Sequence, residues 1–173
     1  MGKDRKKIEE AIKTNRIILR EITEEDADEI VAMREDKEVY QYFTKPHKIT
    51  KAEHISWFFD NYLNNDDRID FVAVVSDDSK FKDSVVGVFG IKREGKNSKT
   101  VEISYLLKNE ARGKGYASEA LKCLMKFAEV KWKCNEVEAV IHRNNIHSIR
   151  FIENNGFKFK TSDNDFCYYG LTL

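Results

Sequence analysis

The sequence is poor in proline and cysteine and has no repeats or low-complexity tracts. Its one proline is Pro46, and no linker-like stretch divides the chain, which favours a single domain. The three cysteines, Cys123, Cys134 and Cys167, are odd in number and form no Cys-x-x-Cys pair. This pattern excludes a disulfide framework and a cysteine zinc site, and it predicts reduced thiols in a cytoplasmic protein.

Long hydrophobic segments and a net charge are also absent. The longest apolar runs, 71–75 and 85–91, are far shorter than the roughly 20 residues that span a bilayer. Residues 1–7 are highly charged with no apolar segment behind them, so we expect neither a secretory signal nor a membrane partner. Thirty basic residues balance thirty acidic ones, which argues against a nucleic-acid partner and requires any anion site to be local.

What the chain does contain is the composition of a globular domain. Its 173 residues are 41% hydrophobic and 35% charged, which is enough to bury a core. Apolar β-branched runs predict strands, and apolar residues at helical spacing predict helices. We expect strands over 16–20, 71–75, 85–91, 101–107, 137–141, 157–161 and 166–173. We expect helices over 4–13, 23–34, 37–43 and 50–63, from 116 onward, and over 146–154.

The stretch 101–121 has the pattern of a strand, a basic glycine loop and the start of a long helix. The loop 112–115 (Arg-Gly-Lys-Gly) has two glycines, which tolerate positive φ and let successive backbone N–H groups point inward. The helix that begins near Tyr116 adds free N–H groups and the positive end of its dipole. The arginine and lysine of the loop add two full charges. Together these features predict a site for a phosphate or pyrophosphate.

Two common phosphate loops do not fit this stretch. A nucleoside-triphosphate loop needs Gly-x-x-x-x-Gly-Lys-Ser/Thr, but Lys114 is followed by Gly115. A dinucleotide fingerprint needs a third small residue where Ser118 stands. That fingerprint also opens a βαβ series, whereas this unit follows hairpin-like strands.

A third pattern matches in order and spacing. The loop Arg112-x-x-Gly115-x-Ala117 is similar to the Arg/Gln-x-x-Gly-x-Gly/Ala loop that holds the pyrophosphate of coenzyme A in the GNAT acetyltransferase superfamily. The other similar segments are Leu19-Arg20 with Asp26-Ala27, Glu102-Ile103-Ser104-Tyr105, and Asn145-x-x-Ser148 with Arg150 and Gly156-Phe157. The second of these resembles the Glu-Ile-Gly-Tyr segment of the branch that includes ribosomal-protein N-acetyltransferases. The resemblance extends from about residue 16 to the C-terminus.

This resemblance implies a fold and a reaction. The fold is α/β (α+β), with a mixed, mostly antiparallel central sheet of about seven strands flanked by helices. We therefore expect an acetyltransferase domain over 16–173, preceded by a helical extension over 1–15. The implied reaction moves acetyl from acetyl-CoA to a primary amine of a small molecule, by direct attack in a ternary complex.

The resemblance also implies which residues hold acetyl-CoA. Backbone groups of Leu106, Leu107 and Lys108 would bind the pantetheine arm. The remaining residues implied to bind acetyl-CoA are Arg112, Gly113, Lys114, Gly115, Tyr116, Ala117, Asn145, Ser148 and Phe151.

Glu102 is the candidate general base, acting through water. Alternation along the strand places Glu102 and Ser104 on one face, which can border a polar cleft. The alternative for Glu102 is a carboxylate on a solvated sheet face. A backbone N–H near Tyr105 or Leu106 would stabilise the developing oxyanion.

The general acid is less well defined. Many relatives place a tyrosine four residues before the Gly-Phe pair, where this chain has Ile152. Ser148 is the candidate replacement, with a helix-capping hydroxyl or direct loss of the thiolate as alternatives. Asn145 resembles the pantetheine-binding asparagine, although an asparagine at a helix entry is also a common cap.

The acceptor is indicated by a weaker resemblance. Residues 48–58 resemble the Ile-Ser/Thr-x-x-Glu-His-x-x-Trp segment of amino-sugar-nucleotide N-acetyltransferases, such as those of pseudaminic acid biosynthesis. Met33 and Glu35 replace the tryptophan and asparagine of that group's upstream Trp-Arg-Asn pattern. The residues implied to contact the acceptor are Arg34, His54, Trp57 and Tyr105. Core packing would equally explain a tryptophan and a histidine on a helix.

Other functions stay open at this point. The acceptor could equally be a protein N-terminus or a polyamine, as in the same branch of the superfamily. A catalytically degenerate module that senses acetyl-CoA is an alternative of another class. His47, His142 and His147 show no metal-ligand spacing, so we expect no metal site. The oligomeric state, monomer or homodimer, stays open.

Overall fold

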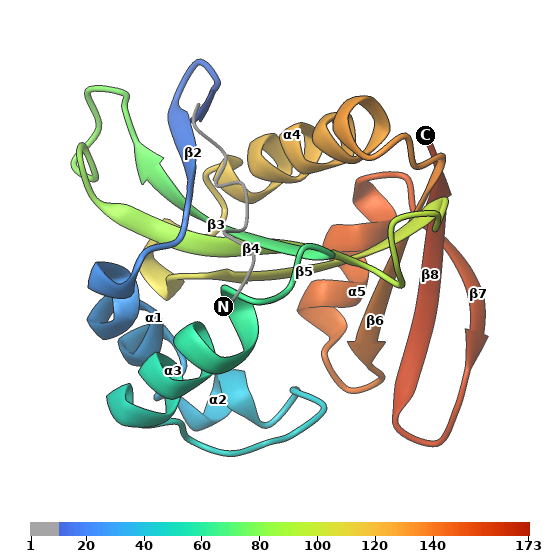
Figure 1. The fold of residues 1–173 in the computed structure, drawn as a ribbon, viewed down its shortest axis with the longest axis horizontal. Coiled ribbons are helices and arrows are strands. Elements are labelled where there is room, and N and C mark those ends of the chain that lie inside the picture. The colour runs from blue at the N-terminus through green and yellow to red at the C-terminus, as the bar shows by residue number, and fades with distance from the viewer. Residues whose placement is uncertain (1–10) are drawn as a thin grey trace.

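An eight-stranded sheet is the framework of the computed structural model, which describes residues 11–173. Its order is β1-β2-β3-β4-β5-β6-β8-β7 (Figure 1). The strands are β1 (Ile12–Lys13), β2 (Ile17–Glu21), β3 (Arg68–Val75), β4 (Val85–Arg93), β5 (Thr100–Leu107), β6 (Glu136–His142), β7 (Lys158–Ser162) and β8 (Phe166–Thr172). Every neighbouring pair is antiparallel except β5 and β6. The expected mixed, mostly antiparallel sheet is confirmed, with the short β1 added to the seven expected strands.

A helix was expected over 4–13, and the structure describes only the last residues of that segment. Residues 1–10 lie outside the described part of the chain, and Ile12–Lys13 is a strand that pairs with β2. A tight turn joins the two strands, because the N–H and the hydroxyl of Thr14 both donate to the Ile17 carbonyl. Pairing with a ready-made sheet edge outweighs the weak helix preference of a short polar segment.

The helical segments match the expected ones, with one change of pitch. They are the 3₁₀ turn η1 (Glu24–Asp26), α1 (Ala27–Met33), α2 (Lys37–Tyr40), α3 (Lys51–Trp57), the π turn η2 (Phe58–Tyr62), the 3₁₀ turn η3 (Asn109–Ala111), α4 (Tyr116–Lys131) and α5 (Ile146–Asn154). The expected capping box opens α3: the Thr50 N–H donates to Glu53 Oε2 at 2.7 Å, and the Glu53 N–H donates to Thr50 Oγ1 at 3.2 Å. The helix expected over 50–63 is present, but it continues as a π turn from Phe58.

Helices cover both faces of the sheet (Figure 1). Side chains that alternate along β3 face opposite ways, so Phe71 lies in the large core with Leu121 of α4, whereas Val72 packs on the other side. There it meets a smaller cluster with Ile30 of α1 and Phe58 of η2. At roughly 1.5–3 kcal/mol for each large apolar side chain buried, this smaller cluster can hold the segment 24–62 against the sheet. We call that segment the arm.

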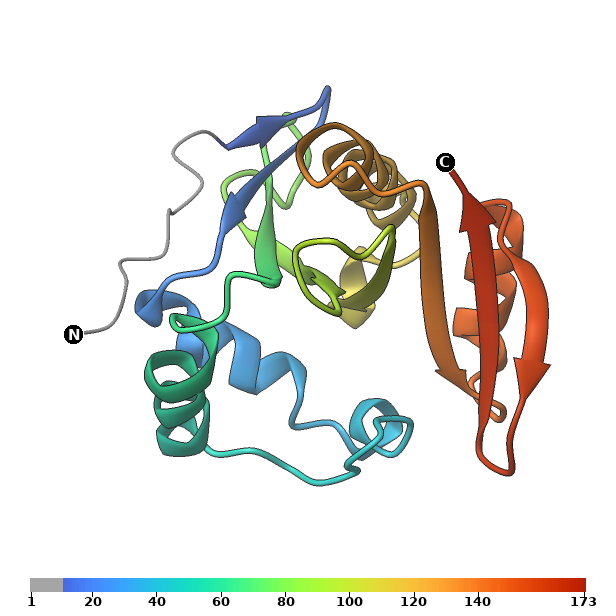
Figure 2. The same ribbon diagram turned by 45° about the vertical axis from the view of Figure 1, so that its right-hand side comes forward.

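The sheet divides where its one parallel pair ends. The pairing of β5 with β6 stops at Ile103 and Ala139, although β5 continues to Leu107 and β6 to His142. Beyond that point the two ribbons part, and β6, β8 and β7 form a separate wing with α5 (Figure 2). We call the space between the diverging ends of β5 and β6 the gap. A gap of this kind leaves strand N–H and C=O groups free to bond a ligand instead of a neighbouring strand.

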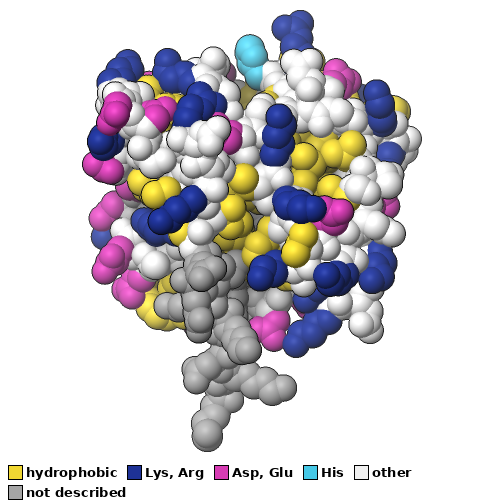
Figure 3. Space-filling model, turned by 90° about the horizontal axis from the view of Figure 1, so that it is seen from above, with side chains coloured by type: hydrophobic (Ala, Val, Ile, Leu, Met, Phe, Trp, Pro, Cys, Tyr) yellow, Lys and Arg dark blue, Asp and Glu magenta, His cyan; other side chains and the backbone are white. Residues whose placement is uncertain are grey.

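The surface carries no single dominant charge. On the face seen from above in Figure 3, Lys and Arg side chains are interspersed with uncharged and hydrophobic surface. This dispersal agrees with the equal numbers of basic and acidic residues in the chain. Across residues 11–173, none of the helices has the length and apolarity to cross a membrane.

Candidate functional site

The backbone of β5 offers two residues to the gap. The Lys108 N–H donates to the Val86 carbonyl of β4 at 2.8 Å, and the Lys108 carbonyl accepts from the Ala111 N–H at 3.0 Å. Backbone N–H and C=O groups alternate in direction along a strand. Those of Leu106 therefore also face β4, whereas those of Tyr105 and Leu107 face the gap. The expectation for Leu107 therefore fits the geometry. The Lys108 N–H bonds β4 and the Lys108 carbonyl bonds Ala111, and the backbone of Leu106 faces β4, so binding of the pantetheine arm by these two residues stays a prediction.

The glycine loop has the backbone shape expected of an anion site. Gly113 has φ +72° and Gly115 has φ +85°, both in the left-handed region that favours glycine. In the described part of the chain no side chain caps the N-terminus of α4, so its first N–H groups are open to a ligand there. Arg112 and Lys114 are exposed beside them. Open N–H groups, the helix dipole and two cations suit a pyrophosphate, so the loop fits the group that the sequence implied.

Tyr116 contributes to this loop through its backbone. Its ring is 2% exposed, and its hydroxyl donates to Asp77 Oδ2 at 3.3 Å and lies 3.2 Å from Ser79 Oγ. The side chain therefore fixes the start of α4 to the β3–β4 turn. The residue stays a candidate for cofactor binding only through its N–H.

A clamp on this loop was not expected from the sequence. Arg16 Nη1 donates to the Lys114 carbonyl at 2.8 Å, and Arg16 Nη2 lies 2.8 Å from Glu119 Oε2 in α4. Burial raises the pKa of Glu119, but hydrogen bonds from Thr14 and Arg16 outweigh that effect and hold it below its usual value. Sequence patterns give no signal for this contact, because Arg16 and Lys114 are 98 residues apart in the chain.

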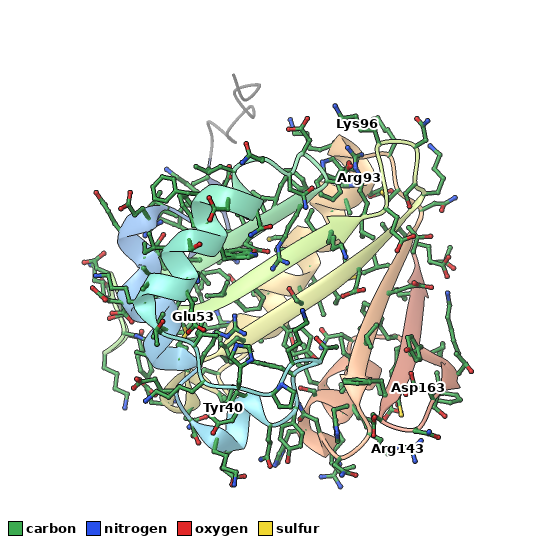
Figure 4. All side chains as sticks on the ribbon, turned by 60° about the horizontal axis from the view of Figure 1, so that its bottom comes forward. Tyr40, Glu53, Arg93, Lys96, Arg143 and Asp163 are labelled. Atoms are coloured by element: carbon green, nitrogen blue, oxygen red, sulfur yellow. The ribbon has the colours of Figure 1, made fainter. Side chains whose placement is uncertain are left out.

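A cavity of about 580 Å³ connects the gap to the arm. Figure 4 looks onto this side of the molecule, with Glu53 on the arm side and Arg143 and Asp163 on the wing side. The loop after α2 lines one side of this cavity, where the ring centroids of Tyr42 and His142 lie 5.6 Å apart. The expected site residues that line this cavity are Arg34, His54, Trp57, Glu102, Tyr105, Leu106, Asn145 and Ser148. Donor and acceptor residues expected from separate motifs thus meet in one space.

Glu102 lies where a base could reach this space. Its side chain is exposed, lines the cavity and shares a sheet face with Lys92 of β4 and Glu138 of β6. It stands one residue before Ile103, where the pairing between β5 and β6 ends. A carboxylate there can be reached by water, through which it could accept a proton.

Asn145 and Ser148 lie at the start of α5, where the sequence allowed each of them to be a helix cap or a functional residue. Asn145 Oδ1 accepts from the Ser148 N–H at 3.2 Å, so Asn145 is the N-cap of α5 and the capping alternative for it is confirmed. The Ser148 hydroxyl makes no hydrogen bond with any residue in 11–173, and Ser148 lines the cavity. Ile152 is fully buried in the core, so a group at that position does not reach the cavity.

Tyr105 and Phe151 pack together on the α5 side of β5. The Tyr105 hydroxyl donates to the Ser148 carbonyl at 3.4 Å, and its ring meets Phe151 edge-on at 4.9 Å. Burial raises the pKa of Tyr105, so the phenol stays protonated at neutral pH. The Tyr105 ring is directed to α5, on the face of β5 opposite Trp57, and Tyr105 also lines the cavity; its contact with the acceptor stays a prediction. Phe151 packs against Tyr105, and its part in acetyl-CoA binding stays a prediction as well.

The arm end of the cavity is polar and deeply buried. His54 is 5% exposed, and its ring centroid lies 5.4 Å from that of Trp57. The guanidinium of Arg68 lies 5.0 Å above the Trp57 ring, and its Nη2 is 2.9 Å from Asp70 Oδ2. A Cβ on Gly90 would come within 2.3 Å of Asp70 Oδ1, so this glycine makes room for the Asp70 carboxylate across β4. Arg68 and Asp70 were not among the residues expected from the sequence, although charged residues at the start of an otherwise apolar strand are a visible signal.

Electrostatics keep the histidine at this end neutral. Burial lowers the pKa of His54, and the nearby Arg34 cation lowers it further, against a weaker opposite effect of Asp26. Burial also lowers the pKa of Arg34, and so does the neighbouring Arg68 cation, although an arginine stays charged. Across residues 11–173, no group of three or more His, Cys, Asp or Glu side chains is arranged to hold a metal ion.

Comparisons with known proteins identify the family of this chain. The family model "Acetyltransferase (GNAT) domain" matches residues 16–158. The chain is 28% identical over 154 residues to "Uncharacterized N-acetyltransferase p20" of Bacillus licheniformis, covering 86% of this chain and 83% of that protein. It is 25% identical over 160 residues to "Uncharacterized protein MJ1062" of Methanocaldococcus jannaschii, covering 89% of this chain but only 31% of that protein.

Solved structures share the fold at low identity. A structure described as "RimL- Ribosomal L7/L12 alpha-N-protein acetyltransferase in complex with Coenzyme A" superposes with a TM-score of 0.79 at 17% identity, covering 95% of this chain and 98% of that one. "Apo FdhC- a nucleotide-linked sugar GNAT" superposes with a TM-score of 0.78 at 20% identity, covering 95% and 91%. The sheet with its gap, the glycine loop and the family match lead to one conclusion. This chain belongs to the GNAT acetyltransferase family, and it is an N-acetyltransferase that takes acetyl-CoA as its donor.

Proposed function

We propose that this enzyme acetylates a primary amine on an amino-sugar nucleotide, in the cytoplasm and within a ternary complex. The observation that carries the proposal is the single cavity that joins the gap between β5 and β6 to the polar end of the arm. A donor in the gap and an acceptor against the arm would meet beside Glu102. Alignment of this kind can contribute roughly 7–11 kcal/mol to lowering a barrier.

The donor side would be held mainly by backbone groups. The N–H groups at the start of α4 and the glycine loop bind the pyrophosphate, and the strand groups of Leu107 bind the pantetheine amides. Arg112 and Lys114 neutralise charge at the loop. When bound, acetyl-CoA supplies an acetyl thioester, whose C–S bond breaks as the new C–N bond forms.

Three groups of this chain would then manage charge and protons. Glu102 accepts the proton of the amine through a water molecule, which keeps the attacking nitrogen neutral. The Tyr105 N–H faces the gap, where it can stabilise negative charge on the acetyl oxygen. The Ser148 hydroxyl, without a partner among residues 11–173, supplies a proton to the leaving thiolate and regains one from solvent.

The chemistry of the arm end favours a small polar acceptor. Trp57 offers an aromatic face for a sugar ring, and the neutral, buried His54 can hydrogen-bond a hydroxyl. Two guanidinium groups at this end, Arg34 and Arg68, disfavour a polycation such as spermidine. The resemblance of residues 48–58 to amino-sugar-nucleotide acetyltransferases supports the same class.

A panel of amines tests this proposal. Release of free thiol from acetyl-CoA is measured with a nucleoside-diphosphate 4-amino sugar, spermidine and a peptide with a free N-terminus. We expect turnover with the sugar nucleotide to exceed that with the other two. Turnover confined to the peptide or to spermidine would overturn the acceptor class. Tight acetyl-CoA binding without turnover on any amine would instead support a sensor.

A further inference from the structure

Two buried nitrogen atoms at the arm end of the cavity have no hydrogen-bond partner within residues 11–173. They are Nε of Arg34 and Nε2 of His54. Both residues line the cavity, and His54 is 5% exposed. Buried polar groups in folded proteins are normally satisfied, so a pair of unsatisfied ones in one cavity indicates a ligand that supplies the partners.

The charges around these atoms show which kind of partner is missing. Arg68 is bonded to Asp70, with Nε 3.0 Å and Nη2 2.9 Å from Oδ2. Arg34 has no ion pair or hydrogen bond to any side chain in residues 11–173, and its guanidinium only stacks on Phe43 at 4.9 Å. Arg34 is thus a half-buried cation that feels the repulsion of Arg68 and a weaker attraction from Asp70, whose carboxylate Arg68 already binds. The group that would satisfy it is an anion.

The geometry narrows the anion to one with several oxygens. A guanidinium presents a planar fork of N–H donors, which matches phosphate or carboxylate oxygens in pairs. A neutral imidazole beside it can bond a hydroxyl or a further anion oxygen through Nε2. A neutral sugar or a polyamine would leave Arg34 with only the weaker attraction of Asp70. The phosphates of a nucleotide supply both negative charge and paired oxygens.

From these contacts we propose that Arg34, assisted by His54, binds the diphosphate of the acceptor and so directs its amine toward Glu102. This inference rests on the proposed acceptor class, and it makes Arg34 the residue that selects nucleotide-linked amines over free ones. Arg34 acts in it as a substrate-binding residue and takes no part in proton transfer.

Direct binding tests the inference without turnover. Affinities for uridine diphosphate and for uridine are measured by calorimetry with coenzyme A saturating, so that the glycine loop is already filled. We expect the diphosphate to bind more tightly than the nucleoside. Arg34→Gln should weaken diphosphate binding at least about tenfold and leave uridine unaffected. Arg34→Lys keeps the charge and loses the planar fork of donors. Its affinity for the diphosphate should lie between that of the wild type and that of Arg34→Gln.

A matched control and a stability measurement guard against a purely structural effect. Lys48→Gln removes one positive charge outside the cavity, from a residue paired with Glu35, and should leave both affinities unchanged. Because an unpaired buried cation is unfavourable in the free enzyme, Arg34→Gln should raise the melting temperature without ligand. A lower melting temperature together with unchanged diphosphate affinity would show that Arg34 is structural and would overturn the inference.

Two further measurements distinguish a failure of this inference from a failure of the proposed function. Glutarate, measured in the same way, distinguishes a carboxylate from a phosphate: equal, Arg34-dependent binding of glutarate and uridine diphosphate would overturn the assignment to a diphosphate. In turnover, Arg34→Gln should raise the KM for the sugar nucleotide and leave kcat near the wild-type value. If the wild type acetylates the sugar nucleotide and the variant keeps its KM, the proposed function survives and the inference fails. If the wild type acetylates no sugar nucleotide, both fail.

Discussion

The donor end and the acceptor end of the cavity are formed by different kinds of groups. The donor end consists of backbone groups from one continuous stretch, the strand, loop and helix start over 101–117. The acceptor end consists of side chains from separate segments, with Arg34 from the end of α1, His54 and Trp57 from α3, and Arg68 from β3. A backbone site depends on glycines at fixed spacing, whereas a side-chain site depends on how distant segments pack.

This difference explains why the two ends carry different kinds of information. A pyrophosphate cradle of N–H groups is the same whatever the acceptor, so the donor end identifies the reaction. The side chains at the acceptor end can change without disturbing the sheet, so they determine specificity. Variants that affect one end and spare the other test the comparison directly.

The largest effect is expected at Glu102, where the two ends meet. Glu102→Gln removes the proton acceptor while keeping the size of the side chain. We expect kcat to fall about 100-fold or more, with little change in the affinity for acetyl-CoA. Rates are measured across pH by thiol release, and binding by calorimetry. Wild-type rates at every pH would show that Glu102 is a solvated carboxylate without a catalytic role.

The next effect is expected at the donor end alone. Gly115→Ala places a Cβ on a residue with φ +85° and within 3.0 Å of Arg16 Nη2. A left-handed conformation costs a residue other than glycine about 1–2 kcal/mol, so the KM for acetyl-CoA should rise about 5- to 30-fold. Gly95→Ala is the matched control, because Gly95 has φ +83° in a turn with open space around it. An equal rise in the acceptor KM for Gly115→Ala would contradict the separation of the two ends.

A smaller donor-end effect is expected from the clamp. Arg16→Gln frees the Lys114 carbonyl and removes the cation that is paired with Glu119, while Thr14 still bonds that carboxylate. We expect the KM for acetyl-CoA to rise about threefold to tenfold, with kcat unchanged. Adding Glu119→Gln should recover part of the loss, because the carboxylate left without a cation is then removed. If the double variant binds acetyl-CoA more weakly than Arg16→Gln alone, repulsion by Glu119 is not the cause.

The smallest effect is expected in the pH dependence of stability at the acceptor end. The pKa of His54 is lowered from 6.5 in the folded protein, so the unfolded chain binds its proton first as pH falls. The free energy of unfolding should therefore decline as pH drops below about 6.5, and it should decline less in His54→Asn. Urea denaturation at pH 7.5 and pH 5.5 measures both. Identical declines in the wild type and the variant would show that His54 does not contribute.

The same contrast decides how much could be read from the sequence. The sheet, the capping box at Thr50 and the glycine loop follow from local patterns, and the structure confirms them. The clamp by Arg16 depends on a contact between distant segments, for which a single sequence holds no signal. Arg68 and Asp70 are neighbours on β3, but their place beside Trp57 depends on how the arm packs against the sheet. The Tyr105 ring lies on the face opposite Glu102, as alternation along the strand predicts, whereas the direction of the Lys108 amide escaped because it depends on where β5 pairs with β4.

The central claim is that both substrates occupy one cavity before acetyl moves between them. Initial rates measured with acetyl-CoA varied at several fixed concentrations of a nucleoside-diphosphate 4-amino sugar test it most directly. The claim predicts double-reciprocal lines that intersect, because both substrates must be bound for transfer. Parallel lines would contradict it, because they would mean that the enzyme takes the acetyl group before the acceptor binds.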